Sequence, residues 1–417
     1  MEKLQGFTDH VMLYVKTLVK WLLAAALIGT VGGAVGSLFR LGVEYATGLR
    51  TEVPALLYAL PFAGVLIVAL YRLLRTQGVG TNAVLDAVHQ GRELPILLIP
   101  AIFLATLLTH LAGGSAGREG AALQIGGGIG YRTGRALHLG EKDLPLATLC
   151  GMSAVFAALF GTPLTATVFA LEVISVGVLY YAGLIPCLMA ASVAYLIASL
   201  FGVSPTRFAV TLPALDVWTV FLVVLLAIGC ALVSILFVRG MHWVEHMAVR
   251  FLKNSYLRAA AGGFAIIGLT LLLGRDYNGA GMDVIARAVE QGEAAPWAWF
   301  LKILFTALTI GCGFKGGEVV PSFFVGATFG CAAGALLGLP PGFAAAIGLV
   351  AVFCGAVNCP IASVVLSVEL FGADAMLYFA IACAISYVLS GYCGLYSSQT
   401  ILYSKLRAEF INVHTKE

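Results

Sequence analysis

Two glycine-rich stretches decide the fold of this chain: GGSAGREGAALQIGGGIGYRTG at Gly113–Gly134 and GCGFKGGEVVPSFFVGATFG at Gly311–Gly330. Each carries charged residues within an apolar region, among them Glu119 in the first stretch and Glu318 in the second. Non-helical backbone cannot face lipid, so such segments at membrane depth must line a space that the protein encloses. Broken helices in the middle of a membrane are typical of transporter sites. We expect a third glycine-rich run, Gly29–Phe39, to be interrupted in the same way.

The composition indicates an integral membrane protein. Apolar residues make up 60% of the 417 residues and charged residues only 11%, whereas soluble domains carry about 25% charged residues. Leu94–Leu111 and Val217–Val238 are clear candidates for membrane spans, which need roughly 20 residues. Met1–Lys20 lacks the short apolar core and cleavage site of a secretory signal, so we expect the first span to direct insertion. The nine cysteines lack metal-type spacing and are interpreted as small hydrophobic residues.

The charge pattern predicts an orientation in the membrane. The net charge of +3 is too small to indicate a nucleic-acid partner. Basic residues near the ends of spans predict, by the positive-inside rule, that both termini are cytoplasmic. They are Lys16, Lys20, Arg72, Arg75, Arg250, Lys253, Lys405 and Arg407.

The two halves of the chain repeat one another. The interval from Pro163 to Glu172 equals that from Pro360 to Glu369, and each proline follows an Ala-Val-Phe triplet at the same distance. One of the two long glycine-rich stretches falls in each half, and homologous halves bring such breaks together near the membrane midplane. The predicted organisation is a cytoplasmic N-terminal segment at 1–20, a first transmembrane repeat at 21–205, a second at 206–404 and a cytoplasmic tail at 405–417.

The segment Gly117-Arg118-Glu119-Gly120 has the chemistry of an anion site. Glycines followed by the start of a helix expose backbone N–H groups, and the helix dipole adds partial positive charge. A glutamate beside such a site occupies it as a carboxylate and leaves when protonated, so a proton and an anion compete for one position. The alternative is that Glu119 ends a cytoplasmic loop and pairs with Arg118. Ionisable groups inside a membrane are functional by default, which favours the anion site.

Three further segments are weaker candidates for the same site. Glu318 begins the second break, where its alternative role is an N-cap carboxylate. The turn at Gly78–Gly80 precedes a predicted helix at Ala83–Gln90, an arrangement that is common in proteins. The hydroxyl of Tyr396 can donate to an anion, but tyrosine is also frequent at membrane interfaces.

Two other features indicate different roles. Glu172 and Glu369 occupy equivalent positions in the repeats, and this symmetry favours a structural role at helix ends over proton transfer. The segment His242–His246 fits the HxxEH pattern of zinc peptidases. Because such short motifs often arise by chance, we interpret it as a polar helix end and expect no metal site.

In this order and spacing, the motifs resemble those of the CLC superfamily of anion transporters over nearly the whole chain. Gly117–Gly120 is similar to the GREGP motif, with alanine in place of the proline, and Gly317–Pro321 is similar to the GxFxP motif. Gly78–Gly80 resembles the start of GSGIP, and Tyr396 falls on the anion-site tyrosine of the family. The resemblance implies an all-α membrane protein with two inverted-topology repeats of tilted and broken helices, and a homodimer with one pathway in each subunit.

The resemblance also implies roles for the residues at the breaks. Glu119 would be the gating glutamate that transfers protons, and Glu318 would couple protons or fluoride from the second repeat. The residues expected around the anion are Gly78, Val79, Gly80, Gly117, Arg118, Gly120, Val319, Val320 and Tyr396.

Departures from the common pattern indicate the substrate. Chloride and nitrate exchangers of the family carry serine or proline at the position of Val79, and chloride/proton exchangers carry an inner proton-transfer glutamate at that of Val173. Glu318 and Val319 replace an apolar–phenylalanine pair. Together these differences resemble the fluoride/proton antiporter branch. That branch often has methionine or asparagine at the Val79 position and can have threonine at the Val320 position, and this chain has neither.

The expected protein is therefore a transporter rather than an enzyme, without a cofactor. We expect it to export fluoride in exchange for protons across the inner membrane of a bacterium, in contact with lipid. The alternatives are a chloride or nitrate/proton exchanger of the same fold and a passive CLC anion channel.

Overall fold

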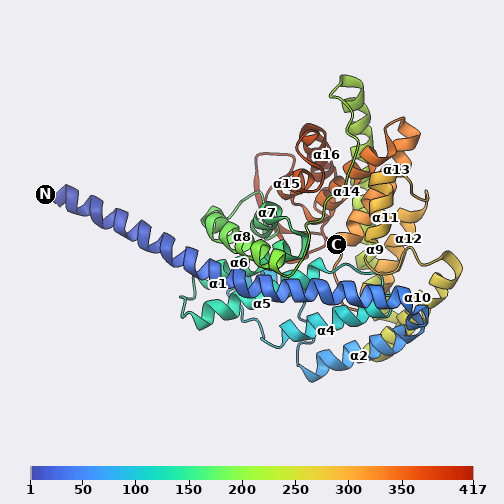
Figure 1. Cartoon of the computed structure of the whole chain (residues 1–417), viewed down its shortest axis with the longest axis horizontal. Coiled ribbons are helices and arrows are strands. Elements are labelled where there is room, and N and C mark those ends of the chain that lie inside the picture. Colours follow the sequence, from blue (N-terminus) through green and yellow to red (C-terminus); the bar gives the residue numbers. More distant parts are fainter. Residues whose placement is uncertain (1, 417) are drawn as a thin grey trace.

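The computed structural model describes residues 2–416, with side chains from residue 12 onward, and the described chain is mostly helical (Figure 1). The N-terminal part of the long helix α1 extends away from the other helices (Figure 1). The α-helices are α1 Glu2–Glu52, α2 Leu60–Leu73, α3 Thr81–Gln90, α4 Leu98–Leu111, α5 Glu119–Ala136, α6 Leu144–Phe160, α7 Pro163–Glu172, α8 Leu184–Leu200, α9 Val217–Phe251, α10 Ser255–Leu273, α11 Met282–Ala286, α12 Ala298–Gly311, α13 Val319–Leu337, α14 Pro341–Val357, α15 Pro360–Phe371 and α16 Met376–Leu389. Short helical turns cover Pro54–Ala59, Tyr181–Gly183 and Arg287–Gln291.

Long and short apolar helices are mixed in this structure. Within the described residues, six helical segments have the length and apolar character to cross a membrane. Six further apolar helices are only 10–17 residues long, shorter than the roughly 20 residues of a full span. This mixture confirms the prediction of a membrane protein with broken helices. All nine cysteines are free and buried, which confirms their interpretation as small hydrophobic residues.

The predicted repeat is visible in how the helices pack. α5 packs against α6 in the first half, and α13 packs against α14 in the second. A Cβ atom on Gly126 would collide with the carbonyl oxygen of Gly151, and one on Gly326 would collide with that of Gly348. Only glycine, which has no Cβ, allows the two backbones to approach this closely. The same close approach therefore recurs at equivalent places in both halves.

The expected interruption at Gly29–Phe39 is wrong, because α1 continues through this segment. A Cβ atom on Gly29 would lie 2.6 Å from the carbonyl oxygen of Ala190 in α8. One on Gly33 would lie 2.8 Å from the Cα atom of Ala194 in the same helix. The glycines of α1 therefore allow close packing against α8 and do not break the helix.

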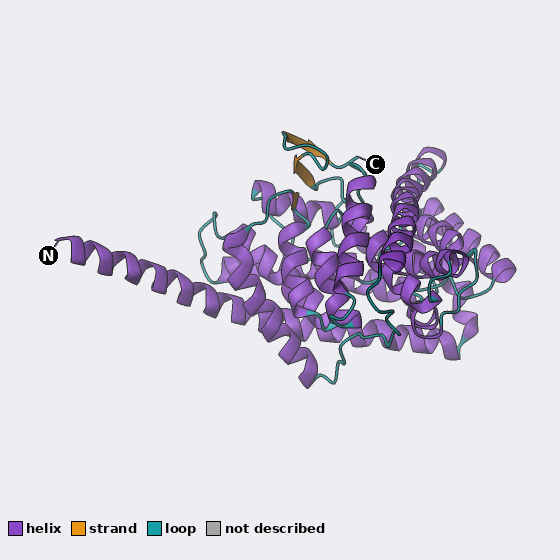
Figure 2. Ribbon diagram, turned by 90° about the horizontal axis from the view of Figure 1, so that it is seen from above, coloured by secondary structure: helices purple, strands orange, loops and turns teal. Residues whose placement is uncertain are grey.

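A small sheet joins the C-terminal segment to the middle of the chain (Figure 2). Strand β1 (Ser175–Val176) pairs in parallel with β2 (Thr400–Tyr403), which pairs antiparallel with β3 (Phe410–His414). The Nζ atom of Lys405, between β2 and β3, donates to Oδ1 of Asn358 at 2.6 Å. The sequence analysis did not predict this sheet, which is added to an otherwise helical protein.

Candidate ion-transport site

The two glycine-rich breaks meet in space. Gly117 and Gly317 each donate a backbone N–H to the carbonyl of the other, both at 2.7 Å. A Cβ atom on Gly317 would lie 2.5 Å from the nitrogen of Gly120 and 2.7 Å from that of Glu119, so this contact requires glycine. α5 begins at Glu119 and α13 begins at Val319. The positively polarised N-termini of two helices, one from each repeat, therefore converge at one point.

The carboxylate of Glu119 occupies this point. Its side chain is fully buried, and Oε2 accepts hydrogen bonds from the backbone N–H of Arg118 at 2.9 Å and of Val320 at 3.2 Å. The two donors come from different halves of the chain. The other oxygen, Oε1, has no hydrogen-bond partner among the described residues. The carboxyl group is thus held by backbone donors of both repeats, and its second oxygen is left unsatisfied.

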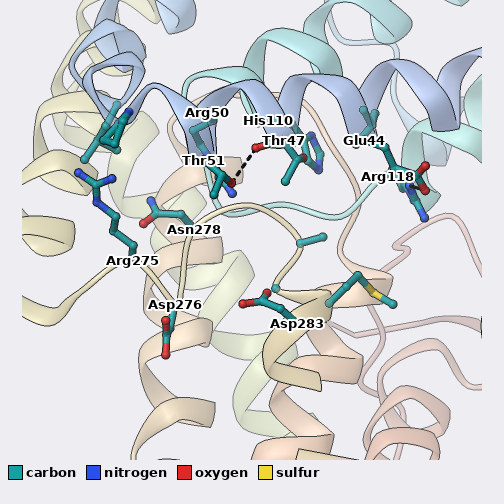
Figure 3. Close-up of a pocket in the computed structure, with 16 residues that line it drawn as sticks. Glu44, Thr47, Arg50, Thr51, His110, Arg118, Arg275, Asp276, Asn278 and Asp283 are labelled. Carbon is teal, nitrogen blue, oxygen red and sulfur yellow. Dashed lines mark hydrogen bonds and ion pairs between the residues drawn. The ribbon is translucent and has the colours of Figure 1, made fainter. Parts of the chain in front are cut away.

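The side chain of Arg118 forms its ion pair with Glu44 and not with this carboxylate. Its Nη1 atom lies 3.4 Å from Oε1 of Glu44 in α1, and this oxygen also accepts from Nε of Arg40 at 2.8 Å. The alternative in which Glu119 forms a side-chain pair with Arg118 therefore does not describe the structure. Arg118 contributes its backbone N–H to the site, and its guanidinium lines a separate pocket (Figure 3).

Tyr396 is buried close to the two acidic residues. Its hydroxyl has no hydrogen-bond partner among the described residues, and it lies within electrostatic range of Glu119 and Glu318. The backbone carbonyl of Tyr396 accepts from Oγ1 of Thr415 at 2.6 Å, so the C-terminal segment holds this residue in place. A buried phenol donor without a partner is a group that an anion could satisfy.

The third break is linked to the other two by polar side chains. The Nδ2 atom of Asn82 donates to Oγ of Ser397 at 3.1 Å, which ties α3 to the Tyr396 loop. Oγ1 of Thr81 accepts from Nε2 of Gln124 in α5 at 3.2 Å. No role was predicted from the sequence for Thr81, Asn82 and Gln124. Their only signal was a polar side chain in the first or second turn of a helix that follows a glycine break.

The turn before α3, Gly78–Gly80, contributes less directly to the candidate site. Gly78 adopts a φ of +74°, a left-handed conformation that favours glycine, and it is exposed. The N–H of Val79 donates to the carbonyl of Thr76 at 3.2 Å, so this donor is used inside the turn. Gly80 is the N-cap residue of α3 and is half-buried. Of the three residues, Gly80 is therefore the one that adjoins a helix N-terminus.

Glu318 and its neighbours form the α13 side of the junction. Val319 and Val320 are buried, while Glu318 is half-buried at the N-cap position of α13. Among the described residues, its carboxylate makes no capping hydrogen bond to that helix. It interacts electrostatically with Glu245 of α9, a group of the same charge. The hydrogen bond that defines an N-cap is therefore absent among the described residues, and the alternative role of Glu318 as an N-cap is not supported.

Glu172 and Glu369 cap helices of opposite repeats. Glu172, at the end of α7, accepts from the backbone N–H of Ala362 at 2.8 Å, near the start of α15. Glu369, in α15, accepts from that of Thr165 at 2.8 Å, near the start of α7. Each carboxylate thus satisfies free N–H groups at the N-terminus of the other helix. The predicted structural role at helix ends is confirmed.

The HxxEH segment lies on α9 and has ordinary helix contacts. Nδ1 of His246 lies 2.8 Å from the carbonyl of His242, one turn earlier. Nε2 of His242 lies 3.4 Å from the carbonyl of Gly394. Within the described part of the chain, no three His, Cys, Asp or Glu side chains are grouped as a metal site requires. Glu245 of this segment interacts electrostatically with Glu318 and with Lys315.

Comparison with known proteins identifies relatives along most of the chain. A family model described as voltage gated chloride channel matches residues 63–391. A chloride/fluoride channel protein of Pseudomonas syringae pv. tomato is 37% identical over 398 residues, covering 93% of this chain and 88% of the relative. An H(+)/Cl(-) exchange transporter of Vibrio campbellii is 25% identical over 383 residues, covering 84% of this chain and 81% of the relative.

Solved structures share the fold. The crystal structure of a CLC-type fluoride/proton antiporter superposes with a TM-score of 0.87 at 32% identity, covering 92% of this chain and 98% of the other. A slow cyanobacterial Cl-/H+ antiporter superposes with a TM-score of 0.77 at 20% identity, covering 89% of this chain and 94% of the other, and this likeness concerns the fold alone. The predicted fold, two repeats of tilted and broken helices, is confirmed.

Proposed function

Because the chain belongs to the voltage-gated chloride channel family, we propose that it is a membrane antiporter that exports fluoride in exchange for protons. The choice of ion is supported by two relatives: one is named a chloride/fluoride channel protein, and one solved structure is a fluoride/proton antiporter. The acid at Glu318 and the absence of serine at Val79 and of an acid at Val173 support the same choice.

The observation that carries the proposal is the position of the Glu119 carboxylate. Its Oε2 accepts from N–H groups of both repeats, at 2.9 and 3.2 Å. A fluoride ion, which accepts short hydrogen bonds, competes for these same donors. When Glu119 takes a proton it loses its attraction for them and leaves the site. Fluoride and a proton thus use one position alternately, and this alternation couples their movements in opposite directions.

The remaining residues at the junction complete the proposed site. The hydroxyl of Tyr396 donates to fluoride, and Glu318 either relays the proton or shapes the fluoride site. Arg118 and Val320 serve through their backbone N–H groups, which Glu119 occupies in this structure. The proposed anion-binding set is Gly78, Val79, Gly80, Gly117, Arg118, Gly120, Val319, Val320 and Tyr396.

The direction of transport has a physical reason. Hydrogen fluoride is a neutral weak acid that enters cells across lipid and dissociates inside. Proton-driven export of fluoride opposes this leak. We place the protein in a bacterial inner membrane as a homodimer surrounded by lipid, with both termini in the cytoplasm. The two repeats then occupy residues 21–205 and 206–404, between terminal cytoplasmic segments.

The test is transport by purified protein in liposomes loaded with fluoride or with chloride. A fluoride or chloride electrode and a pH electrode record the external solution together. Fast fluoride efflux with proportional proton uptake, and little chloride efflux, is the expected result. Rapid proton-coupled chloride efflux would favour the chloride exchanger, and anion efflux without proton movement would favour the passive channel.

A further inference from the structure

A pocket of about 600 Å³ with both charged and apolar lining residues lies beside the ion-transport site (Figure 3). It is bounded by the C-terminal part of α1, the end of α4 and the connection from α10 to α11. Arg118 links the two places, because its backbone N–H donates to Glu119 while its guanidinium lines the pocket. The pocket lies at the end of α1 that is remote from the N-terminus, which is the external side in the proposed orientation.

Two of the acidic side chains in the pocket already have basic partners. Glu44 pairs with Arg40 at 2.8 Å and with Arg118 at 3.4 Å. Asp276 pairs with Arg287 at 3.1 Å. The third acid, Asp283, interacts electrostatically with Arg50 and Lys302. The charged groups that face the pocket and its wall are Arg50 and Glu44 from α1, Arg118 before α5, Lys302 from α12, and Arg275, Asp276 and Asp283 from the α10–α11 region.

Two nitrogen atoms in the pocket have no partner in the described structure. They are Nη1 of Arg50 and Nε2 of His110, and both are buried. His110 is 0% exposed, and its ring forms part of the pocket wall. The guanidinium of Arg50 lies over Gly279, where a Cβ atom would come within 2.9 Å of Nη1. The absence of a side chain at Gly279 leaves room for this guanidinium.

The hydrogen bond of His110 defines what its free nitrogen can do. Nδ1 lies 2.9 Å from the carbonyl oxygen of Thr106, which accepts only, so Nδ1 carries a proton. Nε2 therefore donates to an anion only when the ring holds a second proton. Three basic residues interact electrostatically with this ring and disfavour a positive charge on it: Arg50, Arg118 and Lys302. A second proton would add to these charges unless an anion entered with it.

The buried amino group of Lys302 lies behind the wall of the pocket, close to Gly281. Its Nζ atom donates to the backbone carbonyls of Gly279 at 2.7 Å and Tyr277 at 3.1 Å. These backbone acceptors hold the amino group in place. An anion in the pocket would face Arg50 directly, and its negative charge would favour the protonated form of Lys302 behind the wall.

We propose that the pocket is a second anion-binding site, in which Arg50 and His110 hold a small anion and His110 takes up one proton with it. The proton comes from water and binds to Nε2, which then donates to the anion. The ligand class is a halide or a small carboxylate, since the volume exceeds the needs of a bare fluoride ion. This site is distinct from the position held by Glu119 and does not depend on which anion the protein transports.

Bromide is the probe that locates the site. Crystals of the intact protein soaked in sodium bromide should show an anomalous peak between Arg50 and His110. The peak should persist in Glu119→Gln, which alters only the neighbouring site, and in Arg135→Gln, a charge-matched control at the far end of α5. Arg50→Gln should remove it, and Arg50→Lys should restore part of it. Absence of bromide from the pocket in the unaltered protein would overturn the proposal.

The proton is measured by calorimetry in the Glu119→Gln background, which removes the other carboxyl that bromide could displace. Titrations in two buffers of different ionisation enthalpy report the protons taken up with each bromide ion. We expect uptake that is abolished by His110→Gln, with binding weakened roughly 10- to 100-fold by loss of a charged hydrogen bond. Equal proton uptake with and without His110 would refute its role. Fluoride transport can fail in any of these variants without affecting this result.

Discussion

Gly117 and Gly317 exchange two backbone hydrogen bonds of 2.7 Å, and this reciprocal pair holds the N-termini of α5 and α13 together. Each glycine belongs to the break of one repeat. Glu119 lies two residues beyond the first, and Val320 three residues beyond the second. The site is therefore built at the contact between repeats, and neither half of the chain contains it alone.

The contact predicts that Gly317→Ala damages transport. Its Cβ atom would lie 2.5 Å from the nitrogen of Gly120, so the two helix ends must separate. We expect at least a tenfold loss of fluoride efflux, and destabilisation by about 1–3 kcal/mol from overpacking. The matched control is Gly268→Ala in α10, where a Cβ atom meets nothing within 4 Å. Normal efflux by Gly317→Ala would show that the junction is not the transport site.

Tyr396→Phe tests the phenol as a fluoride donor. The hydroxyl is buried and has no partner among the described residues, so its removal leaves none of them unsatisfied. Loss of a hydrogen bond to a charged ligand corresponds to roughly 10- to 100-fold weaker binding, measured as the fluoride concentration for half-maximal efflux. Tyr378→Phe is the control, because that hydroxyl donates to the carbonyl of Ala214 at 2.8 Å. If both variants keep the same fluoride dependence, Tyr396 does not contact the ion.

Glu318→Gln tests the second acidic residue. The side chain lacks a capping hydrogen bond in the described structure, so the substitution should cost little stability. We expect slower fluoride turnover with an unchanged melting temperature. Unaltered turnover would remove Glu318 from the mechanism. A lowered melting temperature with unaltered turnover would instead assign it a structural role.

Glu172→Ala and Glu369→Ala should destabilise the protein and leave coupling intact. Each substitution frees backbone N–H groups at a helix start, which costs about 1–2 kcal/mol. The two variants should melt at similar, lowered temperatures because their contacts are equivalent. The number of protons moved per fluoride should stay at the value of the unaltered protein. A change in that ratio would assign one of these glutamates to the proton path.

The sequence predicted the parts of the fold that depend on local pattern. The repeat from Pro163 to Glu172 and from Pro360 to Glu369 predicted equivalent helix ends, and the structure shows them capping each other. The glycine-rich break containing Glu119 was predicted because a charge at membrane depth needs an enclosed site.

Other features depended on contacts that the sequence does not show. Glycine both breaks helices and allows close packing, so Gly29–Phe39 could not be assigned until α8 was seen against α1. The small sheet escaped prediction because β1 is two residues long and pairs with a strand near the C-terminus. Asn82 joins the α3 break to the Tyr396 loop across most of the chain, and no spacing pattern indicates such a partner.

The most direct test of fluoride/proton coupling uses a fluoride gradient alone to drive proton movement. Liposomes containing the protein are loaded with fluoride at equal internal and external pH, and the external pH is followed as fluoride leaves. We expect proton uptake into the liposomes in proportion to fluoride efflux, and no proton uptake with Glu119→Gln. Proton uptake that persists in Glu119→Gln, still tied to fluoride efflux, would contradict the claim that this carboxylate and fluoride compete for one site.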